Sequence, residues 1–328
     1  MTSGSDRPEV IVEHVTSPSA TTRVTRVTTT AAAGREPFVL VAGIGVSASY
    51  FEFLAPTLAQ RGDVYALDLA GFAGVAKPRG RTPTISFFAD QVEAVLDHYG
   101  LSTPVLIGHS MGSQIVTEVL TRRSDLRHAV LVSPVVDEQE ATVFRQAVLF
   151  LQSSLRESLH LAMIAVSAYI LCGPVYFLRV LPHMLRYRIT DAVGGLSTRM
   201  LFIRGEHDAT SSRRFHSRLI AACPAASRWE IKGAAHSIIN AHAVGVAKLT
   251  MRHVDDELPR RGRMSDEEAL TPPPLRTDLA MIVGAVAARV REWVSALRGD
   301  EAGVADAKED HAHILWRAYR AGVRHPKD

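Results

Sequence analysis

The feature that most constrains this chain is an apolar run that turns abruptly into a helix around Ser110. Residues 105–107 are Val-Leu-Ile, residues 108–112 are Gly-His-Ser-Met-Gly, and residues 113–120 have the character of a helix. Because glycine has no Cβ, the glycines on either side of the turn let the strand and the helix come close together. The pattern predicts a strand, a tight turn and a helix, with the Ser110 hydroxyl lifted clear of a sheet.

Further apolar runs alternate with helical segments along the chain. Continuous apolar runs of this kind are typical of strands that are buried on both faces of a parallel sheet. The predicted strands are residues 38–42, 64–68, 105–107, 129–133, 200–205 and 228–232, and the predicted helices include 50–60, 86–99, 113–120, 211–222 and 241–253. This alternation predicts an α/β fold in which helices flank both faces of a mostly parallel sheet.

The predicted elements divide the chain into four parts. Residues 1–36 contain a disordered start and two strands, near 10–12 and 22–28. The α/β core is formed by residues 37–136 and 199–254. Residues 137–198 carry helical signals without strand signals and are expected to form an inserted helical cap. Residues 255–328 form a C-terminal extension.

The C-terminal extension is expected to begin with a linker and to continue with helices. Residues 255–278 are rich in proline, arginine and acidic residues. Apolar residues then recur at helical spacing over 279–297, and a charged connector at 299–310 leads to a short helix near 311–321. We expect the 279–297 helix to pack on the domain or on a second copy of the chain, as a homodimer. Peripheral contact with a membrane or partner is the alternative.

One segment has the length and composition of a membrane span. Residues 159–178 contain no Asp, Glu, Lys or Arg and are long enough to cross a bilayer. However, Gly173 and Pro174 interrupt the segment, and it lies between strands of the core. We therefore expect it to be a buried or substrate-facing part of the cap, and we expect no transmembrane segment.

The composition argues against several classes of function. The chain has 328 residues, is 22% charged and carries a formal net charge of only +3, so no nucleic-acid partner is expected. Its two cysteines, Cys172 and Cys223, form neither a disulfide framework nor a metal-ligand pattern. No apolar secretory signal is visible near the N-terminus. A cytoplasmic protein without a bound metal is expected.

A serine hydroxyl at the apex of such a turn suggests nucleophilic catalysis, which needs a base held in one tautomer by a third group. Of the 14 histidines, His236 is the best candidate, because it follows the last predicted core strand in a loop of small residues. His242, in the next predicted helix, is a more distant alternative base.

The expected orienting acid is Asp208, in the loop directly after the 200–205 strand. Its alternative role is to cap the helix that begins near Ser211. Asp137 is the alternative acid, because it follows the neighbouring 129–133 strand. Ligand sites in parallel sheets lie at the carboxyl ends of the strands, where the loops that carry these residues are expected to meet.

An oxyanion formed by attack of Ser110 needs two backbone N–H donors. Met111, the residue after the proposed nucleophile, is expected to supply one. Ile44, in the loop after the 38–42 strand, is expected to supply the other.

Residues 37–253 resemble the α/β-hydrolase superfamily. The resemblance rests on Gly-His-Ser-Met-Gly at 108–112, Gly-Glu-His-Asp at 205–208, Gly-Ala-Ala-His at 233–236 and Asp-Leu-Ala-Gly-Phe at 68–72. It implies the order Ser110, Asp208, His236, a cap before the acid-bearing strand and hydrolysis of acyl bonds without a cofactor. The chain departs from the family pattern at Ala42, where a histidine is usual, and at Ala76, where a serine is usual.

The favoured function is a carboxylesterase or lipase-like serine hydrolase that acts on an ester-type bond of a hydrophobic small molecule. Apolar cap residues are expected to contact the substrate, among them Ile164, Ile170 and Phe177. A C–C hydrolase and a cofactor-free perhydrolase use the same three catalytic groups and remain alternatives. A further alternative is a non-catalytic binder or scaffold that keeps the fold.

Overall fold

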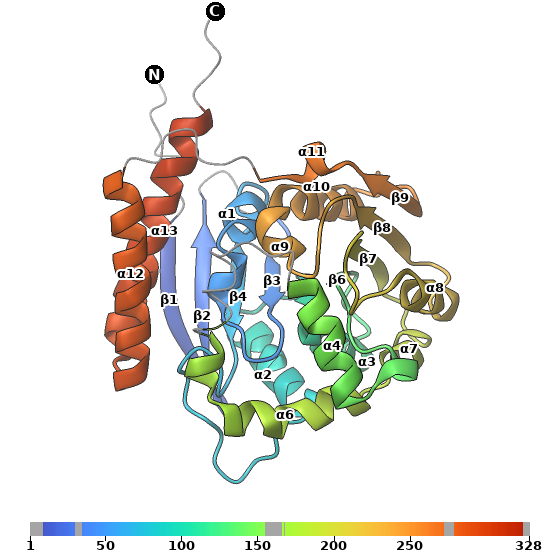
Figure 1. The fold of residues 1–328 in the computed structure, drawn as a ribbon, viewed down its shortest axis with the longest axis horizontal. Helices are drawn as coiled ribbons and strands as arrows, with labels where there is room; N and C mark the ends of the chain where they lie inside the picture. The colour runs from blue at the N-terminus through green and yellow to red at the C-terminus, as the bar shows by residue number, and fades with distance from the viewer. Residues whose placement is uncertain (1–8, 30–34, 155–165, 167, 272–278, 324–328) are drawn as a thin grey trace, which may run out of the picture.

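A computed structural model of the protein describes residues 9–29, 35–154, 166, 168–271 and 279–323. Its centre is a nine-stranded sheet in the order β1-β2-β4-β3-β5-β6-β7-β8-β9 (Figure 1). β2 pairs antiparallel with β1 and β4, and every other neighbouring pair is parallel. The α/β fold with a mostly parallel sheet is therefore confirmed.

The nine strands of the sheet include the six that were predicted from apolar runs of the sequence. They are β1 (Glu9–Thr16), β2 (Thr21–Thr28), β3 (Phe38–Val41), β4 (Val64–Asp68), β5 (Val105–His109), β6 (His128–Val132), β7 (Arg199–Gly205), β8 (Ser227–Ile231) and β9 (Arg261–Met264). Alternate side chains of a strand point to opposite faces, so β3 divides between two cores. Val39 and Val41 join one buried cluster, whereas Phe38 and Leu40 join the other.

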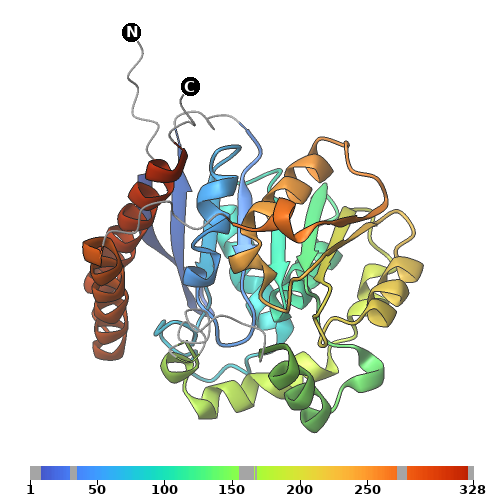
Figure 2. The same cartoon turned by 45° about the horizontal axis from the view of Figure 1, so that its top comes forward.

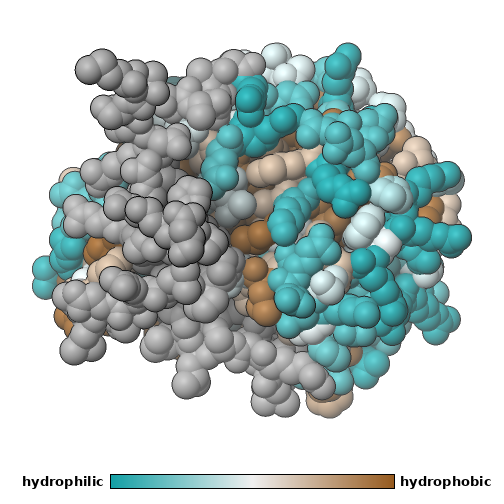
Figure 3. Space-filling view, turned by 90° about the horizontal axis from the view of Figure 1, so that it is seen from above, coloured by the Kyte–Doolittle hydropathy of each residue, from teal (hydrophilic) through white to brown (hydrophobic). Residues whose placement is uncertain are grey.

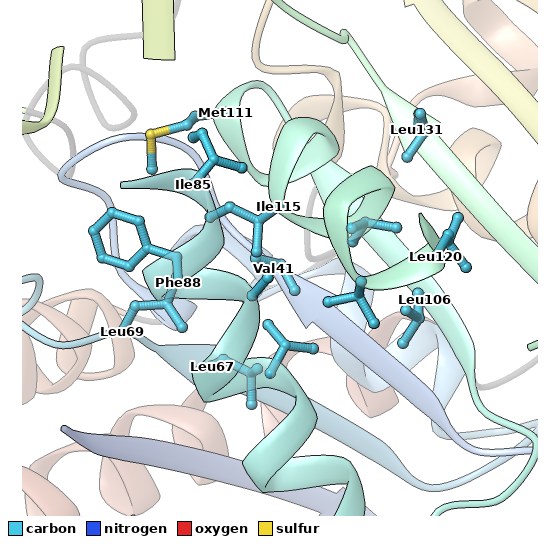
Figure 4. Close-up of a cluster of buried hydrophobic side chains, with 14 of the residues drawn as sticks. Val41, Leu67, Leu69, Ile85, Phe88, Leu106, Met111, Ile115, Leu120 and Leu131 are labelled. Atoms are coloured by element: carbon cyan, nitrogen blue, oxygen red, sulfur yellow. The ribbon is translucent and has the colours of Figure 1, made fainter. Parts of the chain in front are cut away.

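Helices cover both faces of the sheet. One face packs against α2 (Ile85–His98) and α3 (Met111–Arg122), and Figure 4 shows Phe88 and Ile115 of these helices beside Val41 and Leu106 of the strands. The other face packs against α1 (Leu54–Leu58) and α10 (Ala243–Val254). Between β3 and α1 lies a single 3₁₀ turn, η2 (Ala48–Phe51), so the predicted helix at 50–60 is shorter and interrupted.

The inserted segment is helical in its described parts. It contains η3 (Glu138–Glu140), α4 (Val143–Ser154), α6 (Pro174–Arg186) and α7 (Ile189–Val193). Figures 1 and 2 show α4 and α6 across the end of the sheet toward which β3 points, which is the carboxyl end of the parallel strands. Two hydrogen bonds tie α6 to the core, from the Tyr176 hydroxyl to the Ala70 carbonyl (2.9 Å) and from Gln114 Nε2 to the Met184 carbonyl (2.9 Å). The segment is therefore placed to cover this end of the sheet.

Two further helices of the core are α8 (Arg213–Ala222) and α9 (Ile238–Ala241). The sequence predicted a linker at 255–278, but over the described residues 255–271 the chain forms regular structure. It adds the edge strand β9 and the short helix α11 (Asp266–Ala269). Gly262 leaves room for the Trp229 ring, which would lie 2.5 Å from an added Cβ, and Arg263 pairs with Glu230 of β8 (3.0 Å). The expectation that 228–232 is the last strand is therefore wrong.

Two long helices, α12 (Leu279–Arg298) and α13 (Glu301–Val323), follow and lie side by side next to β1 (Figures 1 and 2). We call them the C-terminal hairpin. The charged connector expected at 299–310 is wrong, because most of these residues belong to α13.

α12 presents a different face to the domain from the one its sequence suggested. Its buried side chains include Ala288, Arg289, Glu292 and Ala296. Aliphatic side chains face outward instead, among them Val283, Val286, Val290, Val294 and Leu297. The helix therefore packs on the domain, as one of the two expectations stated, but it does so through a face other than the apolar stripe. The physical reason is that the two buried charges have oppositely charged partners inside the protein, so their burial is compensated.

A helix that crosses a bilayer must be both long and apolar. In the part of the chain that the structure describes, no helix meets both requirements. Of the apolar segment 159–178, residues 159–165 and 167 lie outside the described part. On the face opposite the cap, the described residues are mostly hydrophilic, and hydrophobic residues gather in a small central area (Figure 3).

Candidate active site

Ser110 lies on the turn between β5 and α3 in a strained backbone conformation, with φ 55° and ψ −123°. A residue with a side chain rarely adopts a positive φ, and the flanking glycines make the conformation accessible. A Cβ on Gly108 would lie 2.4 Å from the Gly112 carbonyl oxygen, and one on Gly112 would lie 2.1 Å from the Val41 carbonyl oxygen. Both glycines are therefore required for the close approach of strand and helix.

Gly112→Ala is expected to lower the free energy of unfolding by about 1–3 kcal/mol or more, because its methyl group must displace the β3 backbone. Urea denaturation of the two proteins measures this loss. Gly195→Ala is the matched control, since no atom of the described residues, its chain neighbours apart, lies within 4 Å of its added Cβ. Equal urea midpoints for Gly112→Ala and the control would contradict the tight turn.

Three polar side chains from separate loops meet at the carboxyl end of the sheet. His236 Nε2 lies 3.1 Å from Ser110 Oγ, and His236 Nδ1 lies 3.0 Å from Asp208 Oδ2. Asp208 follows β7, and His236 follows β8. The imidazole thus bridges a hydroxyl and a carboxylate, which is the geometry that lets a serine transfer its proton during attack.

The Asp208 carboxylate is fully enclosed and held ionised. Burial alone would raise the pKa of Asp208, but His236 and the hydrogen bonds it receives lower that pKa below its usual value. The Thr210 hydroxyl donates to Asp208 Oδ1 (2.7 Å), and the backbone N–H groups of Thr210 and Ser211 donate to the same oxygen (3.0 Å each). The carboxylate is therefore fixed in an orientation that offers Oδ2 to His236.

The alternative acid and base lie elsewhere. Asp137 pairs with Arg218 and accepts a hydrogen bond from the Gln139 backbone N–H (3.0 Å). His242 Nε2 contacts Asp266 Oδ1 at 2.8 Å. The structure thus brings Asp208, and neither alternative, together with Ser110 and His236.

Asp208 also does not cap α8. The cap of this helix is Ser212, whose side chain accepts the Phe215 backbone N–H at 3.1 Å.

The loop after β3 passes directly in front of Ser110. We call residues 43–47 the oxyanion loop, after the role that the sequence predicts for Ile44. An added Cβ on Gly43 would lie 3.0 Å from Ser110 Cβ and 3.4 Å from its Oγ. Ile44 follows immediately, and Met111 is the first residue of α3, where a backbone N–H has no partner within the helix. Both predicted donor residues are therefore adjacent to Ser110.

A cavity of about 610 Å³ opens above Ser110 and His236. Its described lining is mainly apolar, and it includes Ile44, Val46, Tyr50, Val135, Val143, Val166, Tyr169, Ile170, Pro174, Phe177, Leu181 and Met184. Two of the three predicted substrate contacts, Ile170 and Phe177, are in this lining. The third, Ile164, lies outside the described residues. A hydrophobic group thus has room next to the serine.

Two residues in direct contact with the site were not anticipated from the sequence. Thr210 contacts both Asp208 and His236, its hydroxyl lying 2.8 Å from His236 Nδ1. His109 lines the cavity, and its Nε2 lies 3.0 Å from the His236 carbonyl oxygen. Burial and the neighbouring His236 lower the pKa of His109 to about 3, so it stays neutral and can donate to that carbonyl. The sequence offered one indication of both residues: His109 lies directly before Ser110, and Thr210 follows Asp208 by two residues.

Metal binding would need several histidine, cysteine or acidic side chains in one place. The described residues contain no group of three or more of these side chains that could hold a metal ion.

A mostly parallel sheet with a serine on a strand-to-helix turn, and an aspartate and a histidine on later loops at the same end, is the architecture of α/β hydrolases. The model of the alpha/beta hydrolase family matches residues 38–249. The chain therefore belongs to the alpha/beta hydrolase family. The C-terminal hairpin lies beyond the matched residues.

Sequence relatives match only a part of the chain. The uncharacterized hydrolase YugF of Bacillus subtilis (strain 168) is 34% identical over 99 residues, which are 30% of this chain and 36% of that protein. The (lyso)-N-acylphosphatidylethanolamine lipase of Bos taurus is 27% identical over 104 residues, 30% of either chain. The chain thus matches about a third of the length of these curated relatives.

Solved structures match over a longer range. The 2-hydroxy-6-oxo-6-phenylhexa-2,4-dienoate hydrolase of Rhodococcus sp. strain RHA1 has a TM-score of 0.62 and 16% identity, covering 76% of this chain and 100% of that one. The naproxen esterase of Bacillus subtilis has a TM-score of 0.56 and 16% identity, covering 75% of this chain and 92% of that one. Identities this low show a shared fold.

Proposed function

We propose that this protein is a serine hydrolase that cleaves an ester-type bond of a hydrophobic small molecule, as a carboxylesterase or lipase-like enzyme. The observation that carries the proposal is the continuous contact from Ser110 through His236 to Asp208 at the base of an apolar cavity. An esterase and a lipase among the similar proteins agree with it.

In the proposed mechanism, Ser110 Oγ attacks the substrate carbonyl carbon while His236 Nε2 takes its proton. The carbonyl oxygen becomes an oxyanion that the backbone N–H groups of Ile44 and Met111 stabilise. Its collapse expels the alcohol, which receives the proton from His236, and leaves an acyl group on Ser110. Water then attacks the acyl group with His236 again as base, and the acid product and free Ser110 are released. These steps require no cofactor.

The lining of the cavity favours an ester or lactone over a charged substrate. Its described residues include no Lys, Arg, Asp or Glu. The dienoate in the name of the Rhodococcus hydrolase carries a carboxylate, and burying a carboxylate without a cation costs several kcal/mol. A neutral acyl or aryl group instead gains roughly 25 cal/mol for each Å² of apolar surface that it buries. We therefore prefer ester hydrolysis to C–C bond hydrolysis.

The test is labelling of the protein with an alkyl fluorophosphonate, followed by mass analysis of the peptide that contains Ser110. We expect one adduct per chain, on Ser110, and hydrolysis of nitrophenyl esters that improves as the acyl chain lengthens. A protein that is not labelled and hydrolyses no ester above background is a non-catalytic binder, and the proposal is then wrong.

We further propose that the exposed aliphatic stripe of α12 pairs with a second copy of the chain. The stripe consists of Val283, Val286, Val290, Val294 and Leu297, which are 39–66% exposed. It extends for roughly 21 Å at 1.5 Å per residue. Its spacing is symmetric about Val290, so an antiparallel two-fold pairing sets aliphatic side chains against one another throughout, as an isologous interface requires.

Val290→Glu is expected to convert a dimer into a monomer in sedimentation velocity, because it places two buried carboxylates on the two-fold axis. Ala302→Glu, which introduces the same side chain at an exposed position of α13, is the control and should leave the dimer intact. A wild-type protein that sediments as a monomer would refute the pairing, and binding of that monomer to lipid vesicles would assign the stripe to a membrane surface.

A cytoplasmic location is proposed from the state of the cysteines. Cys172 and Cys223 are both free and buried, which suits a reducing compartment.

A further inference from the structure

The C-terminal hairpin contacts the domain through charged side chains that are almost fully buried. Arg289, Glu292 and Lys308 are 8%, 5% and 6% exposed. A buried charge is costly unless it has a partner. The partners of these three side chains therefore identify the part of the domain to which the hairpin is bound.

The hairpin's buried charges converge on residues 48–52, which directly follow the oxyanion loop and which we call the anchor segment. Ser49 Oγ donates to Glu292 Oε1 (3.1 Å) and lies 3.3 Å from Lys308 Nζ. Arg289 pairs with Glu52 at 2.9 Å. With His311 Nε2, which lies 3.9 Å from Glu52 Oε2, four side chains of the hairpin thus contact two side chains of the anchor segment.

A third contact reaches the backbone at the start of the anchor segment. The Ala48 N–H donates to Asp68 Oδ1 at 2.5 Å. The other carboxylate oxygen of Asp68 lies 3.1 Å from Lys308 Nζ and 3.2 Å from the Arg23 guanidinium. Lys308 therefore contacts both the carboxylate that holds Ala48 and the hydroxyl of the next residue, Ser49.

The anchor segment also leads to the catalytic histidine. Glu52 accepts a hydrogen bond from Asn240 Nδ2 (3.2 Å), and the Tyr50 hydroxyl lies 2.6 Å from Ser237 Oγ. Ser237 is the residue after His236. The anchor segment thus lies between the hairpin on one side and both active-site loops on the other.

The charged side chains between the hairpin and the anchor segment stabilise one another. Burial would raise the pKa of Glu292, but Lys308 and Arg289 lower it to about 2, so the carboxylate stays ionised at neutral pH. The other oxygen of this carboxylate, Glu292 Oε2, lies 2.5 Å from Arg289 Nη1. An enclosed network of paired charges and hydrogen bonds has few favourable arrangements, so it holds residues 48–52 in one position.

Building on the proposed hydrolase function, we propose that the C-terminal hairpin fixes the oxyanion loop against Ser110 by holding the anchor segment, with Lys308 and Glu292 as positioning residues of the active site. At one end of this loop, a Cβ added to Gly43 would lie 3.0 Å from Ser110 Cβ. Just beyond the other end, Asp68 binds the Ala48 backbone N–H. A displacement of about 1 Å in such a loop can lower the rate about 100-fold.

The test compares Lys308→Met with the wild type in ester turnover and in amide hydrogen exchange of residues 43–48. The variant should fold, because Asp68 keeps Arg23 and Glu292 keeps Arg289. We expect kcat to fall between about 10-fold and 100-fold, KM to change little, and exchange of these amides to become faster. Lys308→Arg should restore much of kcat. Ser49→Ala, which removes the hydroxyl without removing a charge, should act in the same direction.

Arg291→Met is the matched control, because Arg291 lies in the same hairpin but pairs only with the exposed Asp310 among described residues (2.7 Å). If Lys308→Met and Ser49→Ala match Arg291→Met in kcat and in exchange of residues 43–48, the inference is overturned. If the wild type is neither labelled by fluorophosphonate nor active, the proposed function is wrong, and amide exchange alone then decides whether the hairpin holds the loop.

Discussion

Ser110→Ala is expected to lower kcat for a nitrophenyl ester by about 10⁵-fold to 10⁶-fold, with the protein still folded. Removing the nucleophile eliminates the acyl-enzyme route, and the remaining rate comes from binding and from the oxyanion donors. The Ser110 side chain is small and lies at the edge of the cavity, so its loss should not change the fold. Steady-state kinetics and circular dichroism measure the two effects.

The control for Ser110→Ala is Ser113→Ala, one turn further along α3. The Ser113 hydroxyl is fully buried and donates to the Gly108 carbonyl at 2.9 Å, away from His236. Its loss is expected to cost about 1 kcal/mol of stability and to leave kcat per folded enzyme within a few-fold. A Ser110→Ala variant that keeps wild-type turnover would show that another group is the nucleophile.

The second large effect is expected for Asp208→Asn, at about 10⁴-fold in kcat. The asparagine amide can present N–H groups to His236 Nδ1, where the carboxylate accepts a hydrogen bond at 3.0 Å. The imidazole would then carry its proton on Nε2, the nitrogen that faces Ser110, and could not act as its base. The loss should appear mainly in kcat, because Asp208 does not line the cavity.

Asp137→Asn is the matched comparison, since Asp137 is also a buried aspartate on the neighbouring loop. Its partner is Arg218, so we expect reduced stability and turnover within a few-fold of wild type. The opposite result, with Asp137→Asn inactive and Asp208→Asn active, would move the acid to Asp137 and require the two loops to rearrange.

The sequence was sufficient to predict the strands β1 to β8 and the residues gathered at the carboxyl end of the sheet. Strands such as Phe38–Val41 are buried on both faces of the sheet, so nearly all of their residues are apolar. Such a run can be recognised in the sequence without a structure. Parallel strands bring the loops after β5, β7 and β8 to one end, so Ser110, Asp208 and His236 could be placed together from their order alone.

Strand β9 and the orientation of α12 could not be predicted in this way. The Arg-Gly-Arg-Met sequence of β9 has no alternating apolar pattern, and it is held by Trp229 and Glu230 of the neighbouring strand. Arg289 is buried because it meets Glu52, which lies 237 residues earlier. Hydrophobic periodicity is read from one helix alone and contains no information about a distant partner. It therefore predicts that a charged residue such as Arg289 faces solvent.

The contacts of the C-terminal hairpin also have a consequence for the stage of synthesis at which the proposed active site is complete. All three proposed catalytic side chains have been added once the ribosome passes His236, whereas Lys308 comes 72 residues later. At roughly 5–20 residues per second, this delay lasts several seconds. The nascent chain should therefore hold all three proposed reactive groups before the loop proposed to stabilise the transition state is secured, and full turnover should be reached only after Lys308 has been added.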